Sequence, residues 1–360
     1  MKRRLSKTTK VLVTAVGGGG HGEQILKALL HASDSRLEIS AADMSETCPQ
    51  LNWVQKKFRL PPATASGYLE ELLAICDEED INALFHGCEP ELRLFSRERK
   101  AIEDAKIFLP INPASVIETG LNKARTSRFL EQNGFEPPVW TECENRGDIF
   151  KVERFPVVVK PSVGGGGSAN CFIAQDRREL EALADYLHLE EEPQSFILQE
   201  YVGRPDQEYT VGVLHDLNGN FLNSIAVKRD LLGSLGTKIR VKNRTERTDL
   251  GENLVISTGI SQGIIGHFPE VTETCERIAA RLDVRGAINI QCRLVDGVVK
   301  VFEINPRFSG TTSLRAMVGY NEPHLLIRRH LFGEDIKPRF DYKEGRIARG
   351  LYEEFLPEPV

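Results

Sequence analysis

The strongest constraint on the fold of this chain is a change in its hydrophobic pattern near Pro156. Before that residue, apolar runs such as Lys10–Val16 and Asn82–His86 alternate with amphipathic helical segments such as Tyr68–Asp77. Such alternation predicts βαβ units and a parallel sheet. After Pro156, short strands dominate, and a single helical segment at 176–187 interrupts the first five of these strands. We therefore expect an α/β lobe followed by an α+β region.

The length of the chain indicates more than one structural unit. Its 360 residues exceed the size at which a single core usually keeps growing. We expect an N-terminal Rossmann-like lobe over 1–112, a lid and linker subdomain over 113–195, and a C-terminal subdomain over 196–360. The element predictions are strands at 10–16, 37–41, 82–86, 106–109, 157–160, 171–173, 196–199, 208–214, 221–228, 287–294 and 298–304, and helices at 22–31, 68–77, 91–105, 122–132, 176–187 and 271–282.

The composition predicts a cytoplasmic protein that binds neither membranes nor nucleic acid. Apolar residues make up 41% and charged residues 27% of the chain, and no apolar run reaches the ~20 residues of a membrane span. The net charge of -6 lacks the basic footprint that phosphate backbones require. The basic start, 1–6, leads into a short strand rather than a signal peptide. Seven cysteines without a C-x-x-C pair indicate free thiols in a reducing compartment.

A polar pattern near the end of the chain predicts a metal site. Glu303 and Asn305 are two residues apart on a predicted strand, so they share one face. Their carboxylate and amide oxygens, with that of Gln291 on the preceding strand, suit Mg²⁺. The alternative is a solvated polar face. Pro306-Arg307 favours the site, because it places a cation where an anionic reaction centre needs one.

The faces of these two strands depend on the turn between them. A two-residue turn at Asp296-Gly297 puts Gln291 and Glu303 on opposite faces. A three-residue loop over 295–297, with Gly297 left-handed, puts them on one face together with Asn289. We expect that three-residue loop, or another connection with the same parity.

A lysine followed by a glycine run predicts a phosphate-binding loop. The strand Val157–Val159 delivers Lys160, and the run Gly164–Gly167 with Ser168 follows it. Glycines let backbone N–H groups approach phosphates, and such a run can close as a lid. Lys160 would add positive charge. This is no P-loop, since no Gly-Lys-Ser/Thr follows the glycines. The alternative is a glycine-rich hairpin without a ligand.

The next strand carries a possible adenine edge. Backbone groups over 199–202 could face an adenine, and Glu208 could accept hydrogen bonds from ribose hydroxyls. By themselves these residues are weak indicators, because glutamates at strand ends are mostly solvated.

Taken in order, these motifs resemble the ATP-grasp superfamily. Lys160 with its glycines, the segment 199–202, Glu208, Gln291 and the segment 303–307 carry the resemblance, which covers roughly residues 10 to 335. They are most like one synthetase half of the carbamoyl-phosphate synthase large subunit. The segments 87–92 and 121–123 look like the single-module relatives of that subunit.

The resemblance implies a role for each matching residue. Lys123 and Lys160 would hold the ATP phosphates, and the lid over them would be Gly164, Gly165, Gly166, Gly167 and Ser168. The adenine would lie against Glu200, Tyr201 and Val202, and the ribose against Glu208. Two Mg²⁺ ions, which Mn²⁺ can replace, would be bound by Gln291, Glu303 and Asn305, with Glu303 bridging the two ions. Arg307 would stabilise an acyl phosphate and its oxyanion. Lys228, at the end of an apolar strand, is a further catalytic candidate, and a solvated lysine is its equal alternative.

The activity implied is that of an ATP- and Mg²⁺-dependent carboxylate–amine ligase with an acyl-phosphate intermediate. The chain shows one module and no glutaminase segment, so a C–N ligase fits better than carbamoyl-phosphate synthesis. The alternatives are an ATP-dependent carboxylase or phosphorylating enzyme, and a non-catalytic nucleotide-binding regulator. Its partners would be a small-molecule carboxylate and an amine, and a homodimer is the default assembly.

The N-terminal lobe offers a weaker indication. Its run Gly17–Gly22 partly matches G-x-G-x-x-G, which would suit a dehydrogenase, but Asp43 is a poor match for the acidic partner. We interpret the run as a strand-to-helix turn. Glu89 is a candidate contact for a substrate amine, with a helix N-terminal position as the alternative. Arg315, like Arg307, is a candidate contact for a carboxylate.

Overall fold

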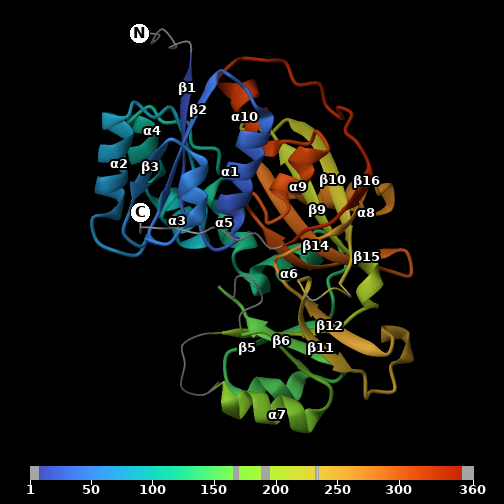
Figure 1. Cartoon of the computed structure of the whole chain (residues 1–360). Coiled ribbons are helices and arrows are strands. Elements are labelled where there is room, and N and C mark those ends of the chain that lie inside the picture. Colours follow the sequence, from blue (N-terminus) through green and yellow to red (C-terminus); the bar gives the residue numbers. More distant parts are fainter. Residues whose placement is uncertain (1–7, 165–169, 188–194, 232, 234, 351–360) are drawn as a thin grey trace.

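The computed structural model describes residues 8–164, 170–187, 195–231, 233 and 235–350. Figure 1 shows an N-terminal α/β lobe beside a large antiparallel sheet, with a smaller lobe below both. This arrangement confirms the predicted fold class, which is mixed α/β with a parallel sheet at the N-terminus.

The N-terminal lobe contains a four-stranded parallel sheet in the order β3-β2-β1-β4. Its strands are β1 (Thr9–Val13), β2 (Leu37–Asp43), β3 (Lys56–Arg59) and β4 (Ala83–Phe85), and its helices are α1 (His21–Ala32), α2 (Tyr68–Glu78), α3 (Glu89–Arg97), α4 (Arg99–Asp104) and α5 (Ala114–Gly120). The helix predicted over 91–105 is two helices that meet at Glu98, and the strand predicted at 106–109 is a single parallel bridge from Phe108 to Ala83. Both faces of β1 are buried, because Val11 and Val13 enter one core and Leu12 another.

Gly87, which follows β4, leaves no room for a side chain. A Cβ atom there would lie 2.0 Å from the carbonyl oxygen of Thr14 and 2.4 Å from that of Ala15. Because both neighbours are backbone atoms, we expect Gly87→Ala to lower the free energy of unfolding by about 1–3 kcal/mol. Gly345→Ala, where a Cβ would meet nothing within 4 Å, should change it by less than about 0.5 kcal/mol. Denaturant unfolding of both variants checks this, and equal midpoints would contradict the crowding at Gly87.

The large sheet is antiparallel throughout, in the order β15-β14-β9-β10-β13-β16. Its strands are β9 (Glu208–His215), β10 (Phe221–Arg229), β13 (Gly263–Gly266), β14 (Ala287–Val295), β15 (Val298–Asn305) and β16 (Gly345–Ile347). One face packs against α8 (Pro269–Arg281). The other face shares a core with α1 and with α10 (Glu322–His330), so the N-terminal lobe and the large sheet are joined.

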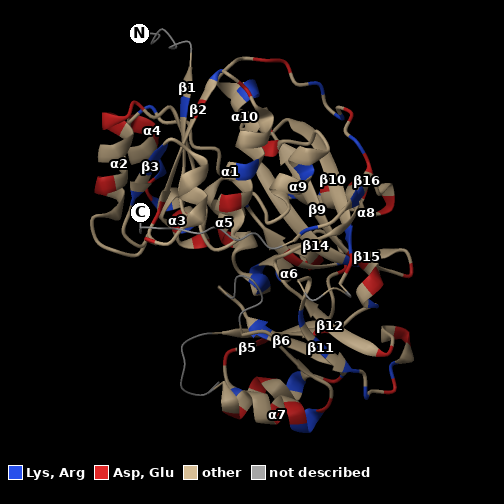
Figure 2. Ribbon diagram, in the orientation of Figure 1, with Lys and Arg blue, Asp and Glu red and all other residues tan. Residues whose placement is uncertain are grey.

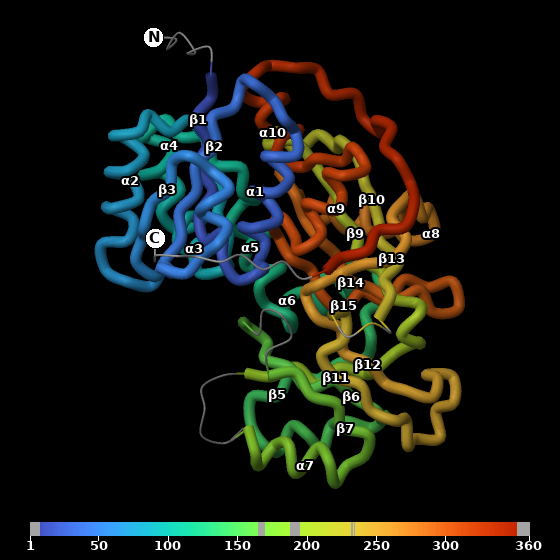
Figure 3. The backbone as a smooth tube through the Cα atoms, viewed as in Figure 1, coloured from blue at the N-terminus to red at the C-terminus, as the bar shows by residue number. Residues whose placement is uncertain are grey.

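The C-terminal segment encloses the large sheet. After α9 (Thr312–Met317) and α10, the chain runs around the outside of this sheet, and β16 then pairs with β13 at its edge (Figure 3). Among the described residues, no helix combines the length and apolar character needed to cross a bilayer.

The small lobe is a second antiparallel sheet in the order β5-β8-β6-β7. Its strands are β5 (Trp140–Cys143), β6 (Val157–Pro161), β7 (Phe172–Ala174) and β8 (Phe196–Glu200), and α7 (Arg177–Tyr186) and the hairpin of β11 (Thr237–Lys242) and β12 (Asn253–Ser257) complete this lobe. The preceding helix, α6 (Lys123–Gln132), packs against the core of the large sheet instead. Because β8 pairs with both β5 and β6, the small lobe continues past the predicted boundary at 195. Acidic and basic residues are interspersed along α7 (Figure 2).

Candidate active site

Gln291 and Glu303 lie on one face of the hairpin, as predicted, but a β-bulge rather than the expected three-residue loop brings them there. Val295 pairs with Val298, so the turn has two residues, Asp296 and Gly297, both with positive φ (49° and 79°). The three-residue loop is therefore wrong. A bulge at Phe302 shifts the register by one, so that Gln291 pairs with Glu303.

The core contacts of β15 show the effect of this bulge. Before it, Val299 and Val301 enter the core beneath α8, and after it Ile304 does. Without the shift, Glu303 would point into that core. The bulge residue Phe302 lines the pocket, and Lys160 Nζ lies 5.6 Å from the centre of its ring.

One pocket lies between the small sheet and the large sheet, and most of the predicted site residues line it. Strand alternation explains which side chains reach it: on β6, Val157 and Val159 enter the small lobe's core, whereas Val158 and Lys160 face the pocket. The predicted residues in its lining are Glu89, Lys123, Lys160, Glu200, Tyr201, Val202, Glu208, Gln291, Glu303, Asn305 and Arg307.

Lys160 links the two sheets. Its Nζ donates to Gln199 Oε1 at 2.8 Å and to the carbonyl oxygen of Phe302 at 3.1 Å. The second contact uses a carbonyl at the bulge of β15, next to Glu303. Burial lowers the pKa of Lys160 to about 8, although the Glu303 carboxylate opposes part of that effect.

The lowered pKa of Lys160 predicts a pH dependence of ATP binding. If the ammonium form binds the phosphates, bound ATP raises this pKa, and affinity is lost as the pH rises through about 8. We expect the association constant to fall about tenfold between pH 7 and pH 9. Calorimetric titration with ATP measures it. Lys160→Arg, whose guanidinium stays charged over this range, should abolish the fall; an unchanged profile would assign the titration to another group.

Gly164, the first residue of the predicted lid, is hydrogen-bonded to Lys123, the other lysine predicted to bind phosphate. Lys123 Nζ donates to the carbonyl oxygen of Gly164 at 2.9 Å, and its backbone N–H donates to Ser162 at 2.8 Å. The other lid residues, Gly165, Gly166, Gly167 and Ser168, lie outside the described residues. Their role stays a prediction.

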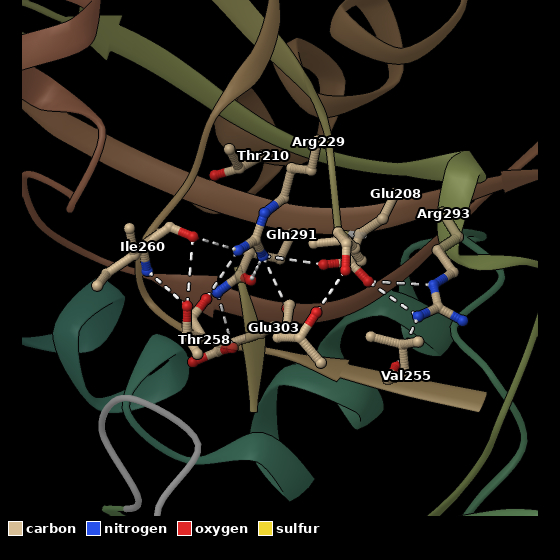
Figure 4. Close-up of polar contacts among 12 residues, drawn as sticks. Glu208, Thr210, Arg229, Val255, Thr258, Ile260, Gln291, Arg293 and Glu303 are labelled. Atoms are coloured by element: carbon tan, nitrogen blue, oxygen red, sulfur yellow. Dashed lines mark hydrogen bonds and ion pairs between the residues drawn. The ribbon is translucent and has the colours of Figure 1, made fainter. Parts of the chain in front are cut away.

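The predicted nucleotide side of the pocket is braced by arginines. Glu200 accepts a hydrogen bond from Arg247 at 3.0 Å. Glu208 is almost fully buried, with one carboxylate oxygen 2.9 Å from Arg229 Nη1 and the other 3.0 Å from Arg293 Nη2 (Figure 4). A carboxylate offers about four acceptor positions, so the ribose role of Glu208 stays a prediction beside this structural one.

The predicted metal ligands form a set that suits Mg²⁺. Gln291 Nε2 donates to Glu303 Oε2 at 2.8 Å, and Asn305 Oδ1 accepts from Arg307 at 2.9 Å. The described residues contain no cluster of three or more His, Cys, Asp or Glu side chains arranged as ligands. One carboxylate with two amide oxygens still fits Mg²⁺, which commonly completes its shell with phosphate oxygens and water.

Arg307 lies where the metal face meets the N-terminal lobe. Its guanidinium donates to Asn305 and to the carbonyl oxygen of Phe308, and it stands 3.6 Å from Glu89, the first residue of α3. Its buried Nε has no hydrogen-bond partner in the described part of the protein. Arg307 therefore retains a donor group for a ligand.

Lys228 and Arg315, which the sequence predicted as site residues, lie outside the pocket. Lys228 is on the face of β10 directed toward α8, with its ammonium 6.0 Å from the ring centre of Tyr209. Arg315 is fully buried, where it pairs with Glu322 at 3.0 Å and donates to Asn289 at 2.6 Å. Both assignments are wrong, because strand alternation turns Lys228 away and Arg315 serves as a buried support beneath Asn289.

Sequence reasoning also missed residues that line the pocket. Arg229 and Arg293 share Glu208, and Gln199 contacts Lys160. Arg293 could have been found from the parity of β14, since Asn289, Gln291 and Arg293 alternate with core residues. Nothing in the sequence indicates that Arg229 rather than Lys228 faces the pocket.

Two family models match separate parts of the chain. The model described as "PylC-like, N-terminal domain" matches residues 11–109, and "ATP-grasp in the biosynthetic pathway with Ter operon" matches residues 259–348. Over residues 259–348 the chain therefore matches an ATP-grasp family.

Curated relatives and solved structures agree with this family. The carbamoyl phosphate synthase large chain of Hyperthermus butylicus is 28% identical over 233 residues, which are 62% of this chain and 19% of that protein. The L-amino acid ligase of Bacillus licheniformis matches with a TM-score of 0.61 at 18% identity, over 92% of this chain and 78% of the other. The biotin carboxylase domain of the Hydrogenobacter thermophilus 2-oxoglutarate carboxylase, solved with MgADP, ADP and bicarbonate, has a TM-score of 0.62 at 16% identity, over 93% and 71%.

The solved structures and the curated relatives support different conclusions about this chain. At these identities the solved structures establish the ATP-grasp fold alone. The chain spans about a fifth of the Hyperthermus butylicus protein, with a covered share of 19%. The activity of that much longer protein therefore does not transfer to this chain as a fact.

Proposed function

We propose that this protein is an ATP- and Mg²⁺-dependent carboxylate–amine ligase that acts through an acyl phosphate and releases ADP and phosphate. The contact between Lys160 and the Phe302 carbonyl supports this proposal most directly. It joins a lysine suited to phosphate to the strand that carries Glu303 and Asn305, inside one pocket that also contains Arg307. Phosphoryl transfer depends on such positioning and charge neutralisation.

In this proposal each part of the pocket has one task. Lys123 and Lys160 neutralise phosphate charge, and the segment 200–202 holds the adenine. Gln291, Glu303 and Asn305 would hold Mg²⁺, which would supply positive charge that screens the γ-phosphate from an approaching anionic nucleophile. Arg307 stabilises charge on the substrate carboxylate and on the acyl phosphate.

The reaction then has two displacements. A carboxylate oxygen attacks the γ-phosphorus and ADP leaves. The amine nitrogen next attacks the acyl carbon, phosphate leaves, and the nitrogen loses a proton. Exclusion of water protects the acyl phosphate between the two steps.

The names of the relatives support ATP use and ligation, and they differ in the substrates they state. A carbamoyl phosphate synthase and an L-amino acid ligase are among them, and the carboxylase domain is described as a dimer with MgADP. We include a homodimer in the proposal, which sedimentation of the intact chain measures.

The test is ADP release from Mg-ATP across a panel of carboxylates that includes amino acids and bicarbonate, with hydroxylamine present to trap acyl phosphates. Equal amounts of hydroxamate and ADP with one carboxylate support the ligase. Lys160→Met should abolish both, whereas Lys100→Met, whose side chain is 87% exposed, should not. ADP with bicarbonate alone favours the carboxylase alternative, ATP binding without ADP favours a regulator, and no ATP binding overturns the proposal.

A further inference from the structure

Arg229 makes five hydrogen bonds at the wall of the pocket, and the chemistry proposed above gives it no part. It ends β10, its side chain is 1% exposed, and it lines the same face as Glu303. Burial of a guanidinium is costly unless its charge and donors are satisfied. Its partners therefore show what fixes this arginine in place.

Arg229 donates to three separate segments (Figure 4). Its Nη1 atom lies 2.9 Å from Glu208 of β9, 2.7 Å from Ser257 Oγ at the end of β12, and 3.3 Å from Gln291 Oε1 of β14. Its Nη2 atom donates to the carbonyl oxygens of Thr258 at 2.8 Å and Ile260 at 3.1 Å. One rigid fork thus bonds the loop 258–262 to two strands of the large sheet.

That loop lies on the Arg307 side of the pocket. Thr258, Gly259 and Ser261 line the cavity. A Cβ atom on Gly310, in the segment after Arg307, would lie 2.7 Å from the carbonyl oxygen of Gly259, so the two segments touch closely. A shift of the loop would therefore alter the space beside Arg307.

Glu208 provides the charge balance that keeps this arrangement stable. It is shared with Arg293, which donates to the carbonyl oxygens of Val202, Gly203 and Val255. Arg293 thereby supports the predicted adenine segment, and Arg229 supports the loop 258–262, on opposite sides of one carboxylate. Lysine, with a single ammonium on a flexible stem, cannot reproduce the fork of Arg229.

We propose that Arg229 is a positioning residue that fixes the loop 258–262 against β9 and β14 and so presets the substrate-carboxylate side of the pocket. Its kinetic consequence rests on the proposed function. Its structural consequence does not, because the contacts exist in the protein without ligands.

The test is amide hydrogen exchange in the intact protein without nucleotide, combined with steady-state kinetics. The reporter amides belong to Thr258, which donates to Gly236, and Ile260, which donates to the Thr258 hydroxyl. We expect Arg229→Lys to speed their exchange about tenfold and to raise KM for the carboxylate about tenfold, with KM for ATP changed less than about threefold. Lys228→Arg, the neighbouring cation on the opposite face, is the matched control and should change neither.

Unchanged exchange in Arg229→Lys overturns the proposal, and so does a rise confined to KM for ATP. Faster exchange in a chain whose wild type shows no ligase turnover supports the positioning role and counts against the proposed function alone. If Arg229→Lys does not fold, Ser257→Ala removes one partner of the guanidinium. We then expect about threefold faster exchange at Ile260, and wild-type exchange there overturns the proposal.

Discussion

Glu303→Gln should lower the rate of ADP release at least about 1000-fold, with little effect on folding. Glu303 is the one carboxylate in the predicted ligand set, because Gln291 and Asn305 supply only amide oxygens. The substitution keeps the shape of the side chain and removes its charge. In the described structure the Glu303 carboxylate accepts a hydrogen bond from Gln291 Nε2 at 2.8 Å, and a glutamine oxygen can accept the same bond.

Two measurements separate the role of Glu303 in metal binding from a structural one. Electron paramagnetic resonance counts Mn²⁺ bound in the presence of ADP, and we expect the Glu303→Gln variant to lose that signal. Thermal unfolding should stay close to wild type. Glu103→Gln, a 54% exposed residue with one surface ion pair, is the control and should leave both unchanged. Turnover of Glu303→Gln within tenfold of wild type would contradict the metal assignment.

The face on which Glu303 lies shows how far sequence reasoning reached. Spacing placed Glu303 and Asn305 together, because strand alternation is local geometry. It could not locate the bulge at Phe302, since a bulge depends on pairing with β14 and on packing beneath α8. The predicted grouping of Gln291 with Glu303 was correct in outcome, although the turn that was meant to produce it was wrong.

Two buried or partly buried cations, Lys228 and Arg315, were placed in the pocket by the sequence and lie outside it in the structure. The sequence favoured Lys228, because it ends an apolar run, and Arg315, because arginine suits a carboxylate. The face that lines the pocket is set by the register of β10 between β9 and β13, and that register brings Arg229 inward. Arg315 is buried because Glu322 and Asn289 surround it. Glu322 follows Arg315 by seven residues but belongs to the next helix, and Asn289 precedes Arg315 by 26 residues. Both pairs depend on how these elements pack, so spacing alone could not reveal them. In contrast, the position of Lys160 in the pocket was predictable, because its strand and the following proline and glycines lie together in the chain.

Arg307→Met should reduce ligation about 100- to 1000-fold, while the dissociation constant for ATP changes less than about threefold. The difference follows from position. Lys123 and Lys160 lie toward the small sheet and the start of the lid, whereas Arg307 faces Glu89 of the N-terminal lobe and keeps a buried Nε without a partner among the described residues. Methionine fills a similar volume but supplies no donor and no charge.

Separate measurement of the two displacements shows which one needs Arg307. Calorimetry gives the affinity for ATP, ADP release gives the first displacement, and hydroxamate yield gives the acyl phosphate that survives. If Arg307 stabilises the acyl phosphate, the variant binds ATP normally and forms neither product, and Arg307→Lys recovers part of the rate because it restores charge without the fork. Weakened ATP binding with an unchanged turnover number would instead make Arg307 a ligand of the nucleotide phosphates, and the substrate carboxylate would then need another cation in the pocket.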